Sequence, residues 1–173
     1  MTDKRPLIIA EIPGLRRFAR GLVGDFALAD DLVQDCLERA LSRLGQWQEG
    51  TNIRAWLCTI LRNIHLNQIR YTSTRPTEPL PENDHKLALS VGPTQDQDHA
   101  IRDIGKALLM LPIEQREVII LVGLEDMSYK ETAEILGVPV GTIMSRLSRG
   151  REALRILMDN KRSNGTSNLR RVK

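Results

Sequence analysis

Hydrophobic residues recur every three or four positions along most of the chain, which is the spacing of one helix face and predicts an all-α protein. The pattern is clearest near the C-terminal end. Ser128 and Glu131 have the spacing of a capping box that begins a helix, and Gly137 supplies its stop. A second helix is expected from about Thr142. Two short helices with a glycine in the turn between them are typical of the helix-turn-helix motif.

The second helix of this motif separates an apolar face from a basic one. Its core positions are Ile143, Leu147, Gly150 and Leu154. The other side carries Thr142, Ser145, Arg146 and Arg149. Hydroxyl and guanidinium groups bind base edges and phosphates in a major groove, so this side is a candidate DNA-binding surface. The alternative is an ordinary amphipathic helix with a solvated basic face.

The N-terminal region predicts a first helix with an uncertain start. Residues 1–12 carry little pattern and are expected to form at most a short turn. Pro13 fits the first position of a helix that ends at Gly24. The basic residues of this helix are expected to face outward; they are Arg16, Arg17 and Arg20.

The next helix is expected at about residues 29–44 and has two sharply divided faces. Its core stripe consists of Val33, Cys36, Leu37, Ala40 and Leu44. The opposite face carries Asp31, Gln34, Asp35 and Glu38. Like charges on one helix face are slightly unfavourable, and a basic partner that docks there would offset the cost. The alternative is a face that only keeps the protein soluble.

A third helix is expected at about residues 53–70, capped by Thr51 or Asn52. Its core stripe consists of Ile53, Trp56, Leu57, Ile60 and Ile64. Residues 52–70 contain no acidic residue, but they carry Arg54, Arg62 and Arg70 together with Asn63. This composition suits nucleic acid, although a plain polar surface would look the same.

Residues 76–98 are rich in proline and mildly acidic, and they predict a flexible linker. A second helical unit is expected from about residue 99, with core positions Ile101, Ile104, Leu108 and Leu111. Pro112 is expected to start a further helix, and the apolar run 118–122 is expected to be the central buried element. The predicted fold is therefore two small helical domains joined by a flexible linker.

Charge is distributed unevenly over the 173 residues. From Arg146 onward there are nine Lys or Arg and two acidic residues, a net +7, whereas the whole chain carries +3. The basic end, including the polar tail 161–173 that is expected to fray, suggests a polyanionic partner.

Several classes of protein lack support in the residues. No secretory signal or membrane-length apolar run is found, so a soluble, cytoplasmic protein is expected. Cys36 and Cys58 lie on apolar helix faces and are expected to be buried free thiols. The three histidines lack metal-ligand spacing. No nucleophile–base pair or phosphate-binding loop is found, so we expect neither an enzyme nor a cofactor.

Three stretches in series resemble the bacterial extracytoplasmic-function (ECF) sigma factors of RNA polymerase. They read ADDLVQDCLERAL, NIRAWLCTILRNIHLNQIR and LPIEQREVIILVGLEDMSYKETAEILGVPVGTIMSRLSRGREALR. The resemblance implies sigma domain 2 at 1–75, the linker at 76–98, and sigma domain 4 with its basic tail at 99–173. It also implies binding to core RNA polymerase, through the β′ clamp helices and the β flap, and to promoter DNA.

The resemblance assigns roles by position. Asp31, Gln34, Asp35 and Glu38 would dock on the clamp helices. The minus-ten strand would be bound by Arg54, Arg62, Asn63, Asn67 and Arg70, with the two asparagines reading unstacked bases. The minus-35 element would be bound by Thr142, Met144, Ser145, Arg146, Ser148 and Arg149. Relatives often carry a basic residue at position 144 and a large one at position 148, so the minus-35 sequence is not predicted.

The resemblance also implies regulation. Trp56 lies on the core stripe, so weak strand opening and strict promoter requirements are expected. A stress-response role, silencing by an anti-sigma factor and a monomeric free state are further expectations. The alternatives are a free-standing helix-turn-helix regulator, an enzyme acting on nucleic acid, and a protein that imitates a sigma factor to sequester its regulators.

Overall fold

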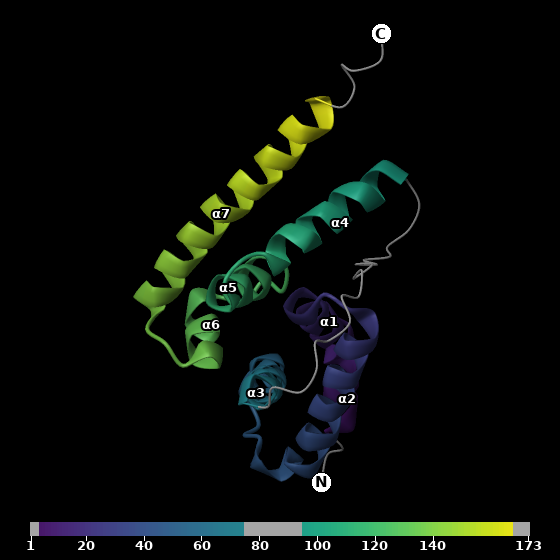
Figure 1. The fold of residues 1–173 in the computed structure, drawn as a ribbon. Coiled ribbons are helices and arrows are strands. Elements are labelled where there is room, and N and C mark those ends of the chain that lie inside the picture. Colours follow the sequence, from purple (N-terminus) through teal and green to yellow (C-terminus); the bar gives the residue numbers. More distant parts are fainter. Residues whose placement is uncertain (1–3, 75–94, 168–173) are drawn as a thin grey trace.

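The structure is a computed structural model that describes the backbone of residues 4–74 and 95–167, with side chains for 4–72 and 101–160. Within these ranges every regular element is a helix (Figure 1). The predicted all-α class is thus confirmed. The predicted linker falls largely outside the described residues, although α4 begins at Gln95, inside the range assigned to it.

The first bundle consists of α1 (Arg5–Val23), α2 (Phe26–Ser42), the short 3-10 helix η1 (Leu44–Gln46) and α3 (Ile53–Thr74). Its boundaries follow local signals. Gly24 ends α1 with φ 74°, in the left-handed region that glycine adopts readily. The Asp25 carboxylate accepts from the Leu28 N–H at 2.9 Å and caps α2. Asn52 caps α3 by accepting from the Ala55 N–H at 3.2 Å.

The expected start of α1 was wrong, because the helix begins at Arg5 and contains Pro13. Pro6 occupies the first turn, where its missing N–H is not needed. Pro13 is exposed, and so is Ile9, the residue whose carbonyl has no helical partner because Pro13 lacks an N–H. Ile8 is buried with Leu15 and anchors the additional turns.

The second bundle consists of α4 (Gln95–Leu109), α5 (Ile113–Gly123), α6 (Tyr129–Leu136) and α7 (Val140–Ser167). The capping box forms as predicted: the Glu131 N–H donates to Ser128 Oγ, and the Ser128 N–H donates to the Glu131 carboxylate. Gly137 ends α6 with φ 66°. The tail expected to fray is helical as far as Ser167, and residues 168–173 lie outside the described part.

Helix α5 is the central element of this bundle, as its apolar run predicted. Val118, Ile119, Ile120 and Leu121 are all buried. One expected core position, Ile104, was wrong, because its side chain is 41% exposed. Helix α4 instead turns Gly105, Ala107 and Leu108 inward.

The two bundles pack directly against each other. Helix α1 lies against α4 and α5, and α3 lies against α6, whereas α7 lies on the far side of the second bundle (Figure 1). Glycines allow the close approach: a Cβ at Gly21 would lie 2.5 Å from Ile120 Cδ1, and one at Gly24 would lie 2.3 Å from Leu109 Cδ1. Among the described helices, none combines the length and apolarity needed to cross a membrane.

Candidate functional site

The acidic face of α2 is open to solvent. Its four members, Asp31, Gln34, Asp35 and Glu38, are all exposed, while Leu32, Val33 and Cys36 on the opposite side are buried. The Gln34 amide donates to Glu38 Oε1 at 3.1 Å. The structure therefore presents this surface, as the period of the sequence predicted.

A groove of about 910 Å³ runs beside the acidic face. Asp31 and Asp35 line it together with the exposed apolar side chains Leu28 and Ile69. His65 lies at its wall and is buried, and burial together with the nearby Arg116 lowers the His65 pKa. Acidic and apolar groups in one groove fit a basic amphipathic helix.

The predicted minus-ten residues of α3 fall into two groups. Asn63, Asn67 and Arg70 are exposed on the outer side of the helix. Arg54 and Arg62 point toward the second bundle instead, with 29% and 17% of their side chains exposed. The structure therefore does not bring the five residues together on one open surface.

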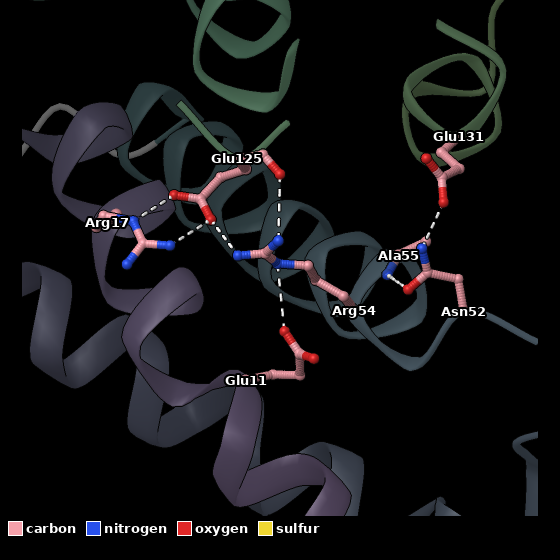
Figure 2. Close-up of polar contacts among 7 residues, drawn as sticks. All are labelled: Glu11, Arg17, Asn52, Arg54, Ala55, Glu125 and Glu131. Carbon is pink, nitrogen blue, oxygen red and sulfur yellow. Dashed lines mark hydrogen bonds and ion pairs between the residues drawn. The ribbon is translucent and has the colours of Figure 1, made fainter. Parts of the chain in front are cut away.

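Arg54 and Arg17 converge on Glu125, a buried residue between α5 and α6 (Figure 2). Arg17 donates from Nε to Glu125 Oε1 at 2.8 Å and from Nη2 to Oε2 at 3.0 Å. Arg54 donates from Nη2 to Oε2 at 2.7 Å and from Nη1 to the Glu125 carbonyl at 3.2 Å. Glu11 forms a further ion pair with Arg54 Nε at 3.2 Å. Arg17, expected to face only outward, is half-exposed and links the two bundles.

Three further polar contacts cross between the bundles. Arg62 Nε donates to Glu117 Oε1 at 2.8 Å, and burial raises the pKa of this carboxyl although Arg62 opposes the shift. Arg116 donates to the Leu22 carbonyl of α1 at 2.8 Å. The Asn52 amide donates to Glu131, joining the caps of α3 and α6 (Figure 2). Sequence reasoning missed Glu117 and Glu125; Glu117 directly precedes the apolar run 118–122, which was its one signal.

The basic side of α7 is partly exposed. Met144, Ser148 and Arg149 are open to solvent, and Thr142, Ser145 and Arg146 are half-buried. Ile143 and Leu147 are buried beneath them. The Ser145 hydroxyl donates to the Thr142 carbonyl at 3.0 Å, which leaves its oxygen able to accept. Arg146 lies near enough to Glu117 to favour its charged form. Arg149 is therefore the basic member most available to a partner.

Two other expectations concern the interior. Cys36 and Cys58 are buried free thiols, and desolvation raises the pKa of each to about 12. Trp56 is half-buried and packs against the core. No cluster of His, Cys, Asp and Glu suited to a metal ion is present among the residues that the structure describes.

Two family models match the chain, one in each bundle. Residues 101–154 match Sigma-70, region 4, and residues 8–62 match the Sigma2 domain of PhyR. The ECF RNA polymerase sigma factor EcfG of Rhodopseudomonas palustris is 40% identical over 159 residues, which cover 91% of this chain and 87% of the relative.

Solved structures show the same likeness. The sigma factor RpoE of Bartonella quintana, in complex with the anti-sigma factor NepR, has a TM-score of 0.75 and 35% identity, covering 92% of this chain and 98% of that one. CnrH, in complex with the cytosolic domain of CnrY, has a TM-score of 0.67 and 25% identity, covering 91% and 90%.

Proposed function

We propose, because this chain belongs to the ECF sigma factors of RNA polymerase, that it binds core RNA polymerase in the cytoplasm and directs it to particular promoters. The observation that carries the proposal is the 40% identity to an ECF sigma factor over 87% of its length, which spans both bundles and not one motif alone. The chain acts as an adaptor and not as an enzyme. Domain 2 occupies residues 1–75, the linker 76–98, and domain 4 with its tail 99–173.

The acidic face of α2 is proposed to dock on the clamp helices of the polymerase β′ subunit. The exposure of Asp31, Gln34, Asp35 and Glu38 supports this role. Complementary charge would speed the encounter and fix its orientation. The second bundle is proposed to contact the β flap.

Promoter DNA is proposed to be read by both bundles. Asn63 and Asn67 are exposed amides, and each can form paired hydrogen bonds with the edge of an unstacked base in the minus-ten strand. Arg54, Arg62 and Arg70 would hold its phosphates. The minus-35 surface comprises Thr142, Met144, Ser145, Arg146, Ser148 and Arg149, of which Arg149 can donate two bonds to a guanine.

An anti-sigma factor is proposed to silence the protein, as part of a stress response. Two solved relatives support this: RpoE, which was solved with the anti-sigma factor NepR, and CnrH, which was solved with CnrY. The groove beside α2 is a suitable binding site for a basic amphipathic helix of such a partner.

A second candidate is a protein that imitates a sigma factor and sequesters its regulators, because residues 8–62 match a sigma-like domain of another protein, PhyR. Reconstituted transcription distinguishes the two. Purified core polymerase is mixed with the full chain and fragmented genomic DNA, and the transcripts are sequenced. A sigma factor yields defined start sites that share two upstream elements, whereas an imitator yields none above the level of core polymerase alone.

A further inference from the structure

The Arg17–Arg54 pair surrounds a carboxylate in the way that arginines surround a phosphate. Both guanidiniums donate to the same Glu125 group, and Arg17 does so through two parallel bonds (Figure 2). Carboxylate and phosphate groups both accept such paired bonds from arginine. The two arginines belong to the first bundle, while the carboxylate comes from the second.

Two backbone features adapt the chain to this contact. Gly14 is buried inside α1, where glycine is less favourable than alanine because it loses more backbone freedom on folding. A Cβ at this position would lie 2.6 Å from Arg54 Nη2 and 3.0 Å from Glu125 Oε2, so the glycine makes room for both groups. Asp126, directly after Glu125, has φ 52°, a left-handed conformation uncommon outside glycine. It forms part of the tight turn from which Glu125 reaches the first bundle.

The charges of the first bundle around Arg54 favour binding of an anion. Residues 52–70 of the first bundle carry no acidic residue, and in the closed chain acidic groups of the second bundle cover part of this stretch. Glu117 accepts a hydrogen bond from Arg62, and Glu131 accepts one from Asn52. Glu125 accepts from Arg54 in the same way. Glu11 is the one first-bundle carboxylate that pairs with Arg54 among the described residues.

We propose that Arg17 and Arg54 form a binding site for a phosphate of single-stranded DNA, and that Glu125 occupies this site when the two bundles are closed. The inference rests on the proposed function, because promoter DNA is the ligand. Glu125 and a DNA phosphate compete for the same donors, so the closed chain is self-inhibited. Separation of the bundles withdraws Glu125 and frees the site.

The test measures DNA binding by the free full-length chain. A short fluorescein-labelled single-stranded DNA of mixed sequence is titrated with wild type and with Glu125→Gln, which keeps the shape and removes the charge. We expect the variant to bind about tenfold more tightly, as when the competent fraction rises from about a tenth to nearly all. Glu152→Gln is the matched control, because it removes one negative charge from the same bundle at an exposed site, where Glu152 pairs with Arg155 of the same helix.

A second measurement follows the separation of the bundles. Fluorophores are placed on Ser42→Cys and Glu134→Cys, both exposed, while the buried thiols of Cys36 and Cys58 stay unlabelled. Energy transfer should fall in Glu125→Gln and when DNA is added to wild type. Gly14→Ala should lower it too, because its methyl group displaces Arg54 without changing any charge.

Three results would overturn the proposal. One is equal DNA affinity for wild type and Glu125→Gln; another is a gain that Glu152→Gln reproduces; the third is a gain that survives Arg17→Ala and Arg54→Ala in the Glu125→Gln background. Circular dichroism confirms that each variant is folded. Transcription by core polymerase with the wild-type chain is assayed separately, so that failure of the self-inhibition and failure of the sigma-factor role are distinguishable.

Discussion

Arg149 and Arg151 lie two residues apart on α7, and both are exposed. Arg149 lies one helical turn from Ser145 and Arg146, whereas Arg151 lies beside Met144 and Ser148 at the edge of the proposed minus-35 surface. A residue that donates two bonds to a base contributes specificity, whereas one that meets a phosphate contributes affinity for any sequence. Substituting each arginine in turn therefore distinguishes recognition of a base from non-specific attraction to the DNA backbone.

Arg149→Ala should weaken binding of the polymerase complex to its minus-35 duplex by about 1–3 kcal/mol and relax selection at one base pair. Arg151→Ala should lower affinity for all sequences alike. The comparison uses competition binding against a set of single-base changes. Identical selectivity in the two variants would mean that Arg149 does not read a base.

Asn63 provides the corresponding test in the first bundle. Asn63→Ala should relax minus-ten selectivity while polymerase binding stays intact, because an exposed amide that reads a base has no part in the α2 docking face. Gln68→Ala, another exposed amide on α3, serves as the control. Loss of polymerase binding in Asn63→Ala would assign this residue to the docking surface instead.

The buried pair of Arg62 and Glu117 should control stability in a pH-dependent way. Arg62→Ala leaves a buried carboxylate without its partner and should cost about 3–5 kcal/mol at neutral pH. A carboxyl whose folded-state pKa is raised adds stability below its unfolded pKa, and this is lost as pH rises through the folded value. The cost should therefore shrink when the pH is lowered from neutral to mildly acidic values, because protonation of Glu117 removes the unpaired buried charge. Urea unfolding at both pH values measures it.

Arg155→Ala is the control for that experiment. Arg155 pairs with Glu152 and Asp159 on the exposed side of α7, where solvent screens the charges. Its loss should leave the unfolding midpoint unchanged at both pH values. A cost for Arg62→Ala that does not vary with pH would show that Glu117 stays charged throughout.

At the scale of elements, helix boundaries with a local signal were predictable and those without one were not. Both ends of α6 have a local sequence signal: the Ser128–Glu131 capping box at its start and Gly137 at its end. The structure contains both hydrogen bonds of the capping box. The start of α1 was missed because Pro13 is normally a first-turn residue, and its tolerance inside the helix depends on exposure.

Ser128→Ala should destabilise the chain by about 1 kcal/mol, because the Glu131 N–H at the start of α6 loses the Ser128 Oγ that accepts its hydrogen bond. Ser148→Ala, an exposed substitution within α7, should leave stability unchanged or slightly higher. Thermal unfolding of both variants measures the difference. Equal effects would mean that the cap contributes nothing specific to this helix.

At the scale of the whole molecule, the sequence indicated which residues are basic but not which of them the fold covers. The composition of the third helix and the family resemblance predict that Arg54 and Arg62 lie open to DNA. Their partners, Glu125 and Glu117, lie 71 and 55 residues away in the sequence. No local pattern encodes a contact at such separation, so only the packing of the two bundles reveals it.

The packing of the two bundles also means that a partner must separate them before it can reach all of the proposed DNA-binding residues. Packed together, the chain exposes the α2 face, Asn63 and Arg149, yet it covers Arg54 and Arg62. A partner that binds the separated bundles more tightly shifts the chain toward that state. Polymerase with promoter DNA is such a partner in our account, and an anti-sigma factor would act in the opposite direction.

The central claim is that one chain reads two promoter elements at once, and photocrosslinking in a single promoter complex tests it most directly. A photoreactive residue is placed at Leu66, on the same face of α3 as Asn63 and Arg70, or at Ser148, beside Arg149, and the crosslinked DNA positions are mapped with core polymerase present. We expect the first to mark the minus-ten strand and the second the minus-35 duplex of the same promoter. Crosslinks from only one position, or the same crosslinks without polymerase, would contradict the account.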